Sequence, residues 1–373
     1  MRIAVVYHRD ERGNEYGMYI TEMLSDYASW LGYTIASVHD FTEKSKNNLP
    51  ENALISTPVN LTSSIGMKWF YNIKLPAIVK NVQADAVICI NGICSLSIKQ
   101  PQLFLLPDIT YVQNKKHAIY SWQKYSSKKI STALHRCNEV ITYSQHAATE
   151  AAKKYPLKNN NYHVIPYSAS LQFRELQWPD RVLAKSQFTG NKEFFACIIN
   201  GYSDEEYIPV LKAFSKFKKW QQSSMQLLLI AENDFVAQSL KEKISNYKYR
   251  EDVQLLDDLT PKQIADLMAS AYSLIHVSKT DSALLPAVQA LQSAIPVIAY
   301  EGKSIHEYCK DAALYARQNN YESLGEQMIN LYKNENLRTQ MIETCKEQSQ
   351  SFKQEKISAE LWNVIEKMVQ QNA

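Results

Sequence analysis

The first half of the chain alternates short apolar runs with longer segments in which apolar residues recur at helical spacing. Runs of roughly four to eight apolar residues are typical of strands buried on both faces, so the alternation predicts a parallel sheet with crossover helices. We expect strands at 2–7, 33–39, 86–91, 102–106, 139–143 and 164–166. The expected helices are 17–31, 73–81, 115–137 and the segment from a capping Ser144 to Tyr155.

The second half repeats this alternation after a polar stretch, 167–191, in which Pro179 and Gly190 indicate irregular structure. We expect strands at 194–200, 226–231, 252–256, 274–277, 295–300 and 313–316. The expected helices are 207–220, 235–246, 261–269, one opened by Pro286, 305–309, 321–333, 336–351 and 356–369. The fold class is therefore α/β, with two similar halves.

The length of 373 residues exceeds that of a usual single domain and supports two. We place the first domain at 1–170, a linker at 171–191, the second domain at 192–352 and a C-terminal helix at 353–373. That helix has Ile357, Leu361 and Ile365 on one face. It either crosses back to the first domain or packs on the second.

Composition narrows the functional classes. The 41 Lys and Arg nearly balance the 38 Asp and Glu and are scattered, which argues against a nucleic-acid partner. The six cysteines have no zinc-like spacing, so we expect reduced thiols and no metal. Neither a signal peptide nor a spanning helix is expected, which favours a cytoplasmic protein and leaves peripheral membrane contact open.

The stretch from Ser278 to Ile298 is the main candidate site. It runs from a loop through a helix opened by Pro286 to a short turn and a buried strand. A loop that leads into a helix directs unpaired N–H groups at an anion, so the amides of Ala283, Leu284 and Leu285 are candidates to hold a nucleotide phosphate. Only nine glycines occur in the chain, which is few for a protein that cradles phosphates.

This arrangement resembles the GT-B glycosyltransferases. Among them it is most similar to the large retaining family called group 1, which is glycosyltransferase family 4-like. The resemblance spans nearly the whole chain, and 278–300 carries most of it, with an acid, a proline and a polar residue at the family's spacing before Pro296-Val297-Ile298. Weaker support comes from 140–144 and from 164–166. The resemblance implies two Rossmann-like domains facing across a cleft, a nucleotide-sugar donor and a carbohydrate or lipid-linked acceptor.

The resemblance also assigns roles to residues. The family's E-x7-E pair, which contacts the donor sugar and the ribose, falls on Asp281 and Gln289. Donor binding would further involve Asn200, Gly201, Lys279 and the amides named above, with Lys303 as a second point charge. Asp108 stands where many members have a His-Asp pair, so Asp281 and Asp108 are the catalytic candidates. Gly13 and Gly17 are the acceptor-binding candidates. No metal or other cofactor is implied.

Several positions depart from the family pattern. The Arg and Lys that usually bind the diphosphate are absent after the strand at 194–200, where Asp204, Glu205 and Glu206 follow instead. These carboxylates also suit the positive end of a helix dipole. Two interpretations stay open: a working retaining glycosyltransferase for polysaccharide or glycoconjugate synthesis, or a degenerate GT-B protein that binds a partner transferase. An epimerase or phosphorylase on the same fold is a third, weaker alternative.

Overall fold

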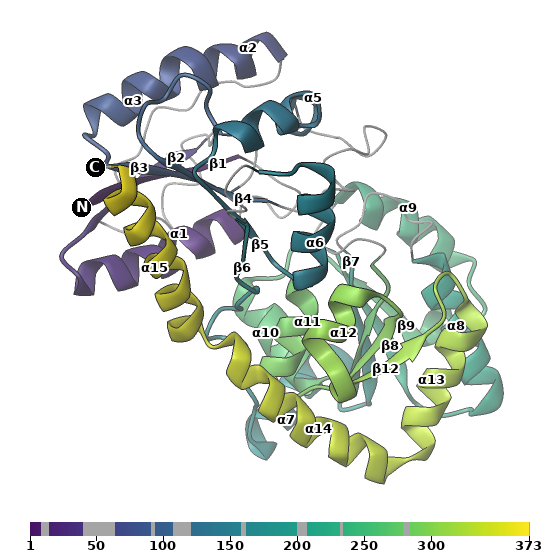
Figure 1. The fold of residues 1–373 in the computed structure, drawn as a ribbon. Coiled ribbons are helices and arrows are strands. Elements are labelled where there is room, and N and C mark those ends of the chain that lie inside the picture. Colours follow the sequence, from purple (N-terminus) through teal and green to yellow (C-terminus); the bar gives the residue numbers. More distant parts are fainter. Residues whose placement is uncertain are drawn as a thin grey trace. The chain divides into compact units, whose positions relative to one another are not determined.

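A computed structural model describes residues 1–8, 15–39, 64–90, 94–106, 121–157, 162–199, 207–231, 234–278 and 284–372. The chain divides into two compact units (Figure 1). Unit 1 comprises Met1–Pro166 and Glu355–Ala373, and unit 2 comprises Tyr167–Gln354.

Unit 1 contains a six-stranded sheet whose paired strands are all parallel, in the order β2-β1-β3-β4-β5-β6. Three of its strands are buried along their whole length, as the continuous apolar runs predict. The strands are β1 (Arg2–Tyr7), β2 (Thr34–His39), β3 (Ala86–Cys89), β4 (Gln102–Leu105), β5 (Glu139–Thr142) and β6 (Tyr162–Val164).

Helices cover both faces of this sheet (Figure 1). On one face, a continuous helical run and α5 (Ser121–Arg136) pack on the strand side chains of a shared apolar core. That run joins α2 (Ser64–Trp69), the π-helical η2 (Phe70–Lys74) and α3 (Leu75–Asn81). On the other face lie α1 (Glu15–Trp30) and α15 (Gln354–Asn372). The remaining helix, α6 (Gln145–Lys154), is capped by the Ser144 hydroxyl, which accepts from the Ala147 amide.

The last helix of the chain belongs to unit 1. Trp362 of α15 is fully buried against Tyr27 and Tyr33, and the Asn138 side-chain Nδ2 donates to the side-chain Oδ1 of Asn372 at 3.0 Å. Of the two placements that the sequence left open, the structure has the helix on the first domain. Residues from both ends of the chain therefore build one core.

Unit 2 contains a second parallel sheet, in the order β12-β11-β10-β7-β8-β9. Counted from its own first strand this order is 6-5-4-1-2-3, which is the doubly wound arrangement of the Rossmann fold. The strands are β7 (Phe194–Ile199), β8 (Gln226–Ala231), β9 (Val253–Leu256), β10 (Ser273–His276), β11 (Val297–Tyr300) and β12 (Ala313–Ala316).

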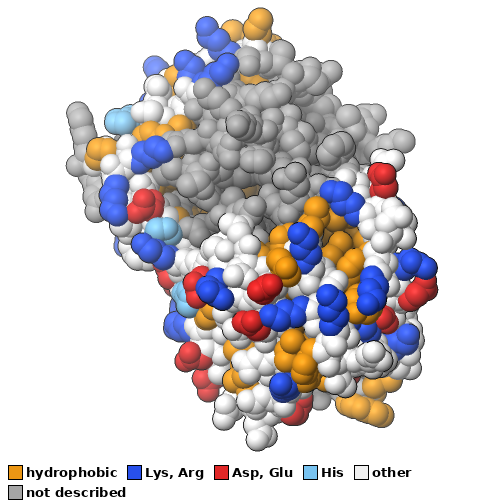
Figure 2. Space-filling view, turned by 90° about the vertical axis from the view of Figure 1, so that its right-hand side faces the viewer, with side chains coloured by type: hydrophobic (Ala, Val, Ile, Leu, Met, Phe, Trp, Pro, Cys, Tyr) orange, Lys and Arg blue, Asp and Glu red, His pale blue; other side chains and the backbone are white. Residues whose placement is uncertain are grey.

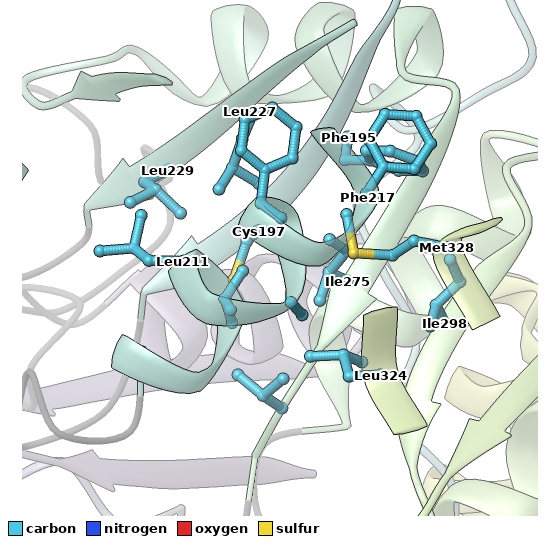
Figure 3. Packing of buried hydrophobic residues seen from close by; sticks show 14 of the residues in the cluster. Phe195, Cys197, Leu211, Phe217, Leu227, Leu229, Ile275, Ile298, Leu324 and Met328 are labelled. Atoms are coloured by element: carbon cyan, nitrogen blue, oxygen red, sulfur yellow. The ribbon is translucent and has the colours of Figure 1, made fainter. Parts of the chain in front are cut away.

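The core of unit 2 lies between this sheet and two helices, α8 (Ile208–Trp220) and α13 (Tyr321–Lys333). Figure 3 shows Cys197, Ile275 and Ile298 from the strands beside Phe217 of α8 and Met328 of α13. The other helices are α7 (Trp178–Thr189), α9 (Asp234–Ser245), α10 (Pro261–Ser270), α11 (Leu285–Gln292), α12 (Lys303–Cys309) and α14 (Glu335–Ser349), with short 3-10 turns η5 (Arg250–Asp252), η7 (Lys310–Ala312) and η8 (Gln350–Phe352).

The structure differs from the sequence prediction in the expected linker. Part of that segment is α7, whose Arg181 guanidinium donates to the Ala271 carbonyl at 3.1 Å within unit 2. Pro179 lies in the first turn of α7, where its missing N–H costs nothing, and Gly190 ends the helix in the left-handed conformation with φ 59°. The two residues that suggested a loop are the start and stop signals of a helix.

Candidate functional site

The candidate site lies at one edge of the unit 2 sheet. Because all six strands are parallel, their carboxyl ends meet at the same edge, and the helices that follow them begin there. Adjacent strands β7 and β10 lead to helices on opposite sides, so they form the topological switch point of this sheet. Open α/β sheets bind ligands at this point.

The sequence-predicted residues of this edge are only partly visible. Asn200 and Gly201 follow β7, and Lys279, Asp281 and Ala283 follow β10, and all five lie outside the described residues. The chain leaves the two strands at Ile199 and Ser278 and is described again at Tyr207 and Leu284. The topology therefore brings the two predicted loops to the same edge of the sheet.

Leu284 and Leu285 form the start of α11, which points its first turn at this edge. Their side chains are buried, with 2 % and 8 % of their surface exposed, so the polar groups they offer a ligand belong to the backbone. Leu284 is the N-cap residue, Pro286 occupies the first turn, and no side chain caps the helix. A helix start without a side-chain cap retains the N–H groups and the positive dipole end that favour an anion.

Gln289 lies one turn into α11 and is half-buried. Its side-chain Oε1 is buried and has no hydrogen-bond partner among the described residues. An unpaired buried amide oxygen costs about 1 to 3 kcal/mol, so such an atom calls for an explanation. A hydroxyl of a bound ligand would satisfy it.

Two further polar residues end neighbouring strands at this edge, and the sequence analysis did not select them. His276 ends β10 and is buried, which lowers its pKa to about 4, so its imidazole is neutral near pH 7 and supplies no charge for a phosphate. Tyr300 ends β11, and burial raises its pKa to about 12. Its hydroxyl is buried without a partner among the described residues. A polar residue at the end of an apolar strand was the available signal for both.

Lys303 is the first residue of α12, which follows β11 at the same edge, and it is exposed. A cation at the N-terminus of a helix is disfavoured by the helix dipole. Lys303 has no ion-pair partner among the residues that the structure describes. Its role as a point charge stays a prediction, and Lys279 lies outside the described part.

In unit 1 the switch point lies between β1 and β3. His8 directly follows β1 and is buried, and its Nε2 forms a 2.6 Å hydrogen bond with the Tyr71 hydroxyl. The sequence analysis missed this pair. Of its own candidates, Gly17 lies in the first turn of α1, whereas Gly13 and Asp108 lie outside the described residues.

No three His, Cys, Asp or Glu side chains gather at metal-binding distances in the described part of either unit. None of the described helices is long and apolar enough to cross a membrane. The six cysteines are all described, and all are free thiols.

Comparison with known proteins agrees with this geometry. Residues 180–348 match the family model of glycosyl transferases group 1. O-antigen chain mannosyltransferase RfbU from Salmonella typhimurium is 22 % identical over 205 residues, which are 54 % of this chain and 53 % of that protein. The alignment thus spans about half the length of the curated relative.

Solved structures match nearly the whole chain. A glycosyltransferase from Rickettsia africae superposes with a TM-score of 0.76 at 14 % identity, covering 99 % of this chain and 98 % of that one. WaaG, a glycosyltransferase involved in lipopolysaccharide biosynthesis, superposes with a TM-score of 0.75 at 12 % identity. The match covers 98 % of this chain and 99 % of WaaG. HepE from Anabaena, in complex with UDP-glucose, superposes with a TM-score of 0.76 at 13 % identity. The match covers 98 % of this chain and 100 % of HepE.

Two doubly wound parallel sheets and this set of structures define the class as GT-B, which confirms the predicted fold. The similarity to the group 1 glycosyl transferases lies in residues 180–348, which fall within unit 2.

Proposed function

We propose that this protein is a glycosyltransferase that moves a sugar from a nucleotide-sugar donor to a carbohydrate or lipid-linked acceptor with retention of configuration. The observation that carries the proposal is the unpaired buried Oε1 of Gln289, one turn into the helix that starts at the switch-point edge of unit 2. RfbU and WaaG act in O-antigen and lipopolysaccharide synthesis, which supports a role in polysaccharide or glycoconjugate synthesis.

Donor binding follows from the residues at this edge. The Gln289 amide oxygen accepts a hydrogen bond from a ribose hydroxyl, and the first-turn amides of α11 hold the diphosphate. Lys303 and Lys279 supply positive charge to the diphosphate. Asn200 and Gly201 allow the protein backbone to approach the donor closely. Asp281 accepts hydrogen bonds from hydroxyls of the donor sugar. The complex of HepE with UDP-glucose makes uridine the first base to test.

Transfer with retention needs positioning more than a strong base. The acceptor oxygen attacks the anomeric carbon on the face from which the diphosphate leaves, and an oxygen of the departing phosphate takes the acceptor proton. The protein contributes orientation and the electrostatic field of the site. Asp108 and Asp281 act as the catalytic residues, Gly13 and Gly17 serve the acceptor side, and no metal takes part. The free thiols are consistent with a cytoplasmic location.

Calorimetric titration with UDP, GDP, ADP and dTDP tests the proposal. We expect one nucleotide to bind at micromolar strength and Gln289→Ala to weaken it about tenfold, the effect of one lost hydrogen bond to a polar ligand. Gln292→Ala is the matched control, because Gln292 also has an unpaired buried Oε1 but lies at the far end of α11. Equal effects of the two substitutions on nucleotide binding would show that Gln289 is not part of the donor site.

A catalytically degenerate GT-B protein that binds a partner transferase is the second candidate. Lys303 is the one Lys or Arg within the first turns of α8, α11 and α12 among the described residues, and three acidic residues at 204–206 precede α8 in the sequence. No binding of any nucleotide by folded protein would favour this candidate. Nucleotide binding without release of UDP from a UDP-sugar, with acceptor extracts added, would favour it as well.

A further inference from the structure

The outward face of the helical run Ser64–Asn81 in unit 1 is apolar. Ile65, Trp69 and Ile73 recur every four residues and expose 82 %, 45 % and 61 % of their surface. Exposed Ala77 continues the same spacing. Single exposed apolar residues are ordinary, but a line of them along one helix indicates a surface that another body covers.

The inward face of the same run is also apolar. Met67, Phe70, Tyr71, Leu75 and Val79 are buried in the core of unit 1. A water-exposed helix on a globular core has polar residues on its outer face. The run therefore has the composition of a helix covered on both sides, although only its inner side packs on the apolar core formed by the described residues. The π-helical turn Phe70–Lys74 lies at the middle of the run, and such turns are frequent at functional sites.

The charges beside the apolar line are all positive. The run 64–82 contains Lys68, Lys74 and Lys80 and no Asp or Glu. Helix α5 packs against α2, and the sequence 121–138 likewise contains no acid, with Lys128 and Lys129 exposed. The segment 94–100 adds exposed Lys99. Figure 2 shows Lys and Arg side chains gathered with hydrophobic ones at the end of unit 1 formed by these helices.

Five of these lysines have no acidic partner within the described part of the chain. Lys68, Lys80, Lys99, Lys128 and Lys129 form no ion pair with any described residue. Other lysines are paired: in unit 2, Lys185, Lys216, Lys218, Lys241, Lys262 and Lys346 each pair with a carboxylate. The Lys74 ammonium lies 5.9 Å from the centroid of the Trp69 ring, so cation and aromatic ring are adjacent. We name the basic apolar face the set Ile65, Trp69 and Ile73 together with Lys68, Lys80, Lys99, Lys128 and Lys129.

We propose that the basic apolar face docks on an anionic phospholipid bilayer. A helix that lies in the plane of a membrane presents Trp and aliphatic residues to the acyl boundary and Lys to the headgroups, which is the composition observed here. Lysine is depleted at protein interfaces, so a protein partner fits this face less well. Lysines without a carboxylate partner are available to lipid headgroups, and each raises membrane partition about fivefold near an anionic surface.

Vesicle co-sedimentation of the full chain tests the proposal. We expect binding to vesicles of phosphatidylcholine with phosphatidylglycerol, none to phosphatidylcholine alone, and loss of binding at high salt. Trp69→Ser combined with Ile73→Ser should lower binding at least tenfold, and so should Lys68→Gln combined with Lys80→Gln. All four side chains are outside the core, so circular dichroism should stay unchanged.

Trp178→Ser is the matched control, because Trp178 is a 76 % exposed tryptophan on α7 of unit 2. It should bind vesicles like the wild type. Absence of vesicle binding, equal binding to neutral vesicles, or equal binding by the Trp69 and Ile73 variant would overturn the proposal. A concentration-dependent dimer that dissociates in that variant, with no vesicle binding, would assign the face to a second copy instead. The outcome is independent of nucleotide binding at unit 2.

Discussion

Trp362, in the last helix of the chain, stacks on Tyr27 of the first helix, with ring centroids 6.4 Å apart and planes 20° from parallel. Tyr33 contacts the same indole at 5.5 Å. These contacts make the C-terminal segment part of unit 1, although the whole of unit 2 separates the two in sequence. Unit 1 therefore cannot complete its core until the rest of the chain has been synthesised.

We expect Trp362→Ala to destabilise unit 1 by about 3 to 5 kcal/mol, because it leaves a large cavity in a site that is 1 % exposed. Urea unfolding followed by circular dichroism measures the loss. The buried indole Nε1 has no partner among the described residues, so Trp362→Phe removes an unsatisfied donor and should cost less, about 1 to 2 kcal/mol. Equal losses in the two variants would show that the cavity is not the dominant cost.

The stability of unit 2 should fall at low pH because of His276. Burial lowers its folded pKa to about 4, whereas the unfolded value is about 6.5. Between these values the unfolded chain binds a proton that the folded one does not, so stability is lost as the pH falls from about 6.5 to about 4. The contribution of this one group is about 3 kcal/mol.

His276→Gln tests that assignment. The variant lacks the titrating group, so its free energy of unfolding should depend less steeply on pH across this window than that of the wild type. The two slopes should agree above about pH 7. Parallel curves throughout the window would show that other groups cause the acid sensitivity.

The Tyr308 hydroxyl accepts a hydrogen bond from the Tyr167 amide at 2.9 Å, and its ring stacks on Phe352 with centroids 4.9 Å apart. Ser168 donates to the Phe352 carbonyl at 2.9 Å. These bonds lie within unit 2 and join the segment where the chain enters that unit to the segment where it leaves.

Tyr308→Phe keeps the stacking and leaves the buried Tyr167 amide without this acceptor, so we expect a loss of about 1 to 3 kcal/mol in thermal or urea unfolding. Tyr315→Phe is a suitable control, because its hydroxyl donates to the Lys310 carbonyl at an exposed position. A loss in the control as large as that in Tyr308→Phe would contradict a special role for the buried bond.

Gln289→Glu should strengthen nucleotide binding if the residue holds the ribose. A carboxylate accepts a charge-assisted hydrogen bond that is about twice as strong as that of an amide, which corresponds to roughly fivefold tighter binding. Calorimetry with the nucleotide that the wild type prefers gives the comparison. Binding weakened to the level of Gln289→Ala would show that the amide nitrogen, rather than the oxygen, makes the essential contact.

Much of the fold could be predicted from local pattern. Continuous apolar runs such as 194–200 and 226–231 predict strands buried on both faces, and the structure has β7 and β8 there. The helix from Trp178 to Thr189 was missed, because Pro179 and Gly190 have the same composition in a loop as at the two ends of a helix. The run 64–81 was predicted only from residue 73, because its exposed apolar residues hide the helical period.

The candidate site was predictable to a smaller extent. The sequence selected Leu284, Leu285 and Gln289 through spacing, and the structure places them on one helix at the switch-point edge. His276 and Tyr300 were not selected, since a single polar residue in an apolar run does not reveal whether its polar atoms are satisfied. The predictions for Asp281, Asp108, Asn200, Gly201, Lys279, Ala283 and Gly13 fall outside the described residues.

The sequence by itself determined the two α/β halves, the order of their elements and the loop-to-helix junction at Pro286, because hydrophobic periodicity and helix signals are local properties. Only the tertiary structure decided that Trp362 packs on Tyr27, that the Oε1 of Gln289 is buried without a partner, and that Ile65, Trp69 and Ile73 remain exposed. Burial and pairing depend on residues far apart in the chain, and one sequence does not specify which of its many apolar surfaces meet.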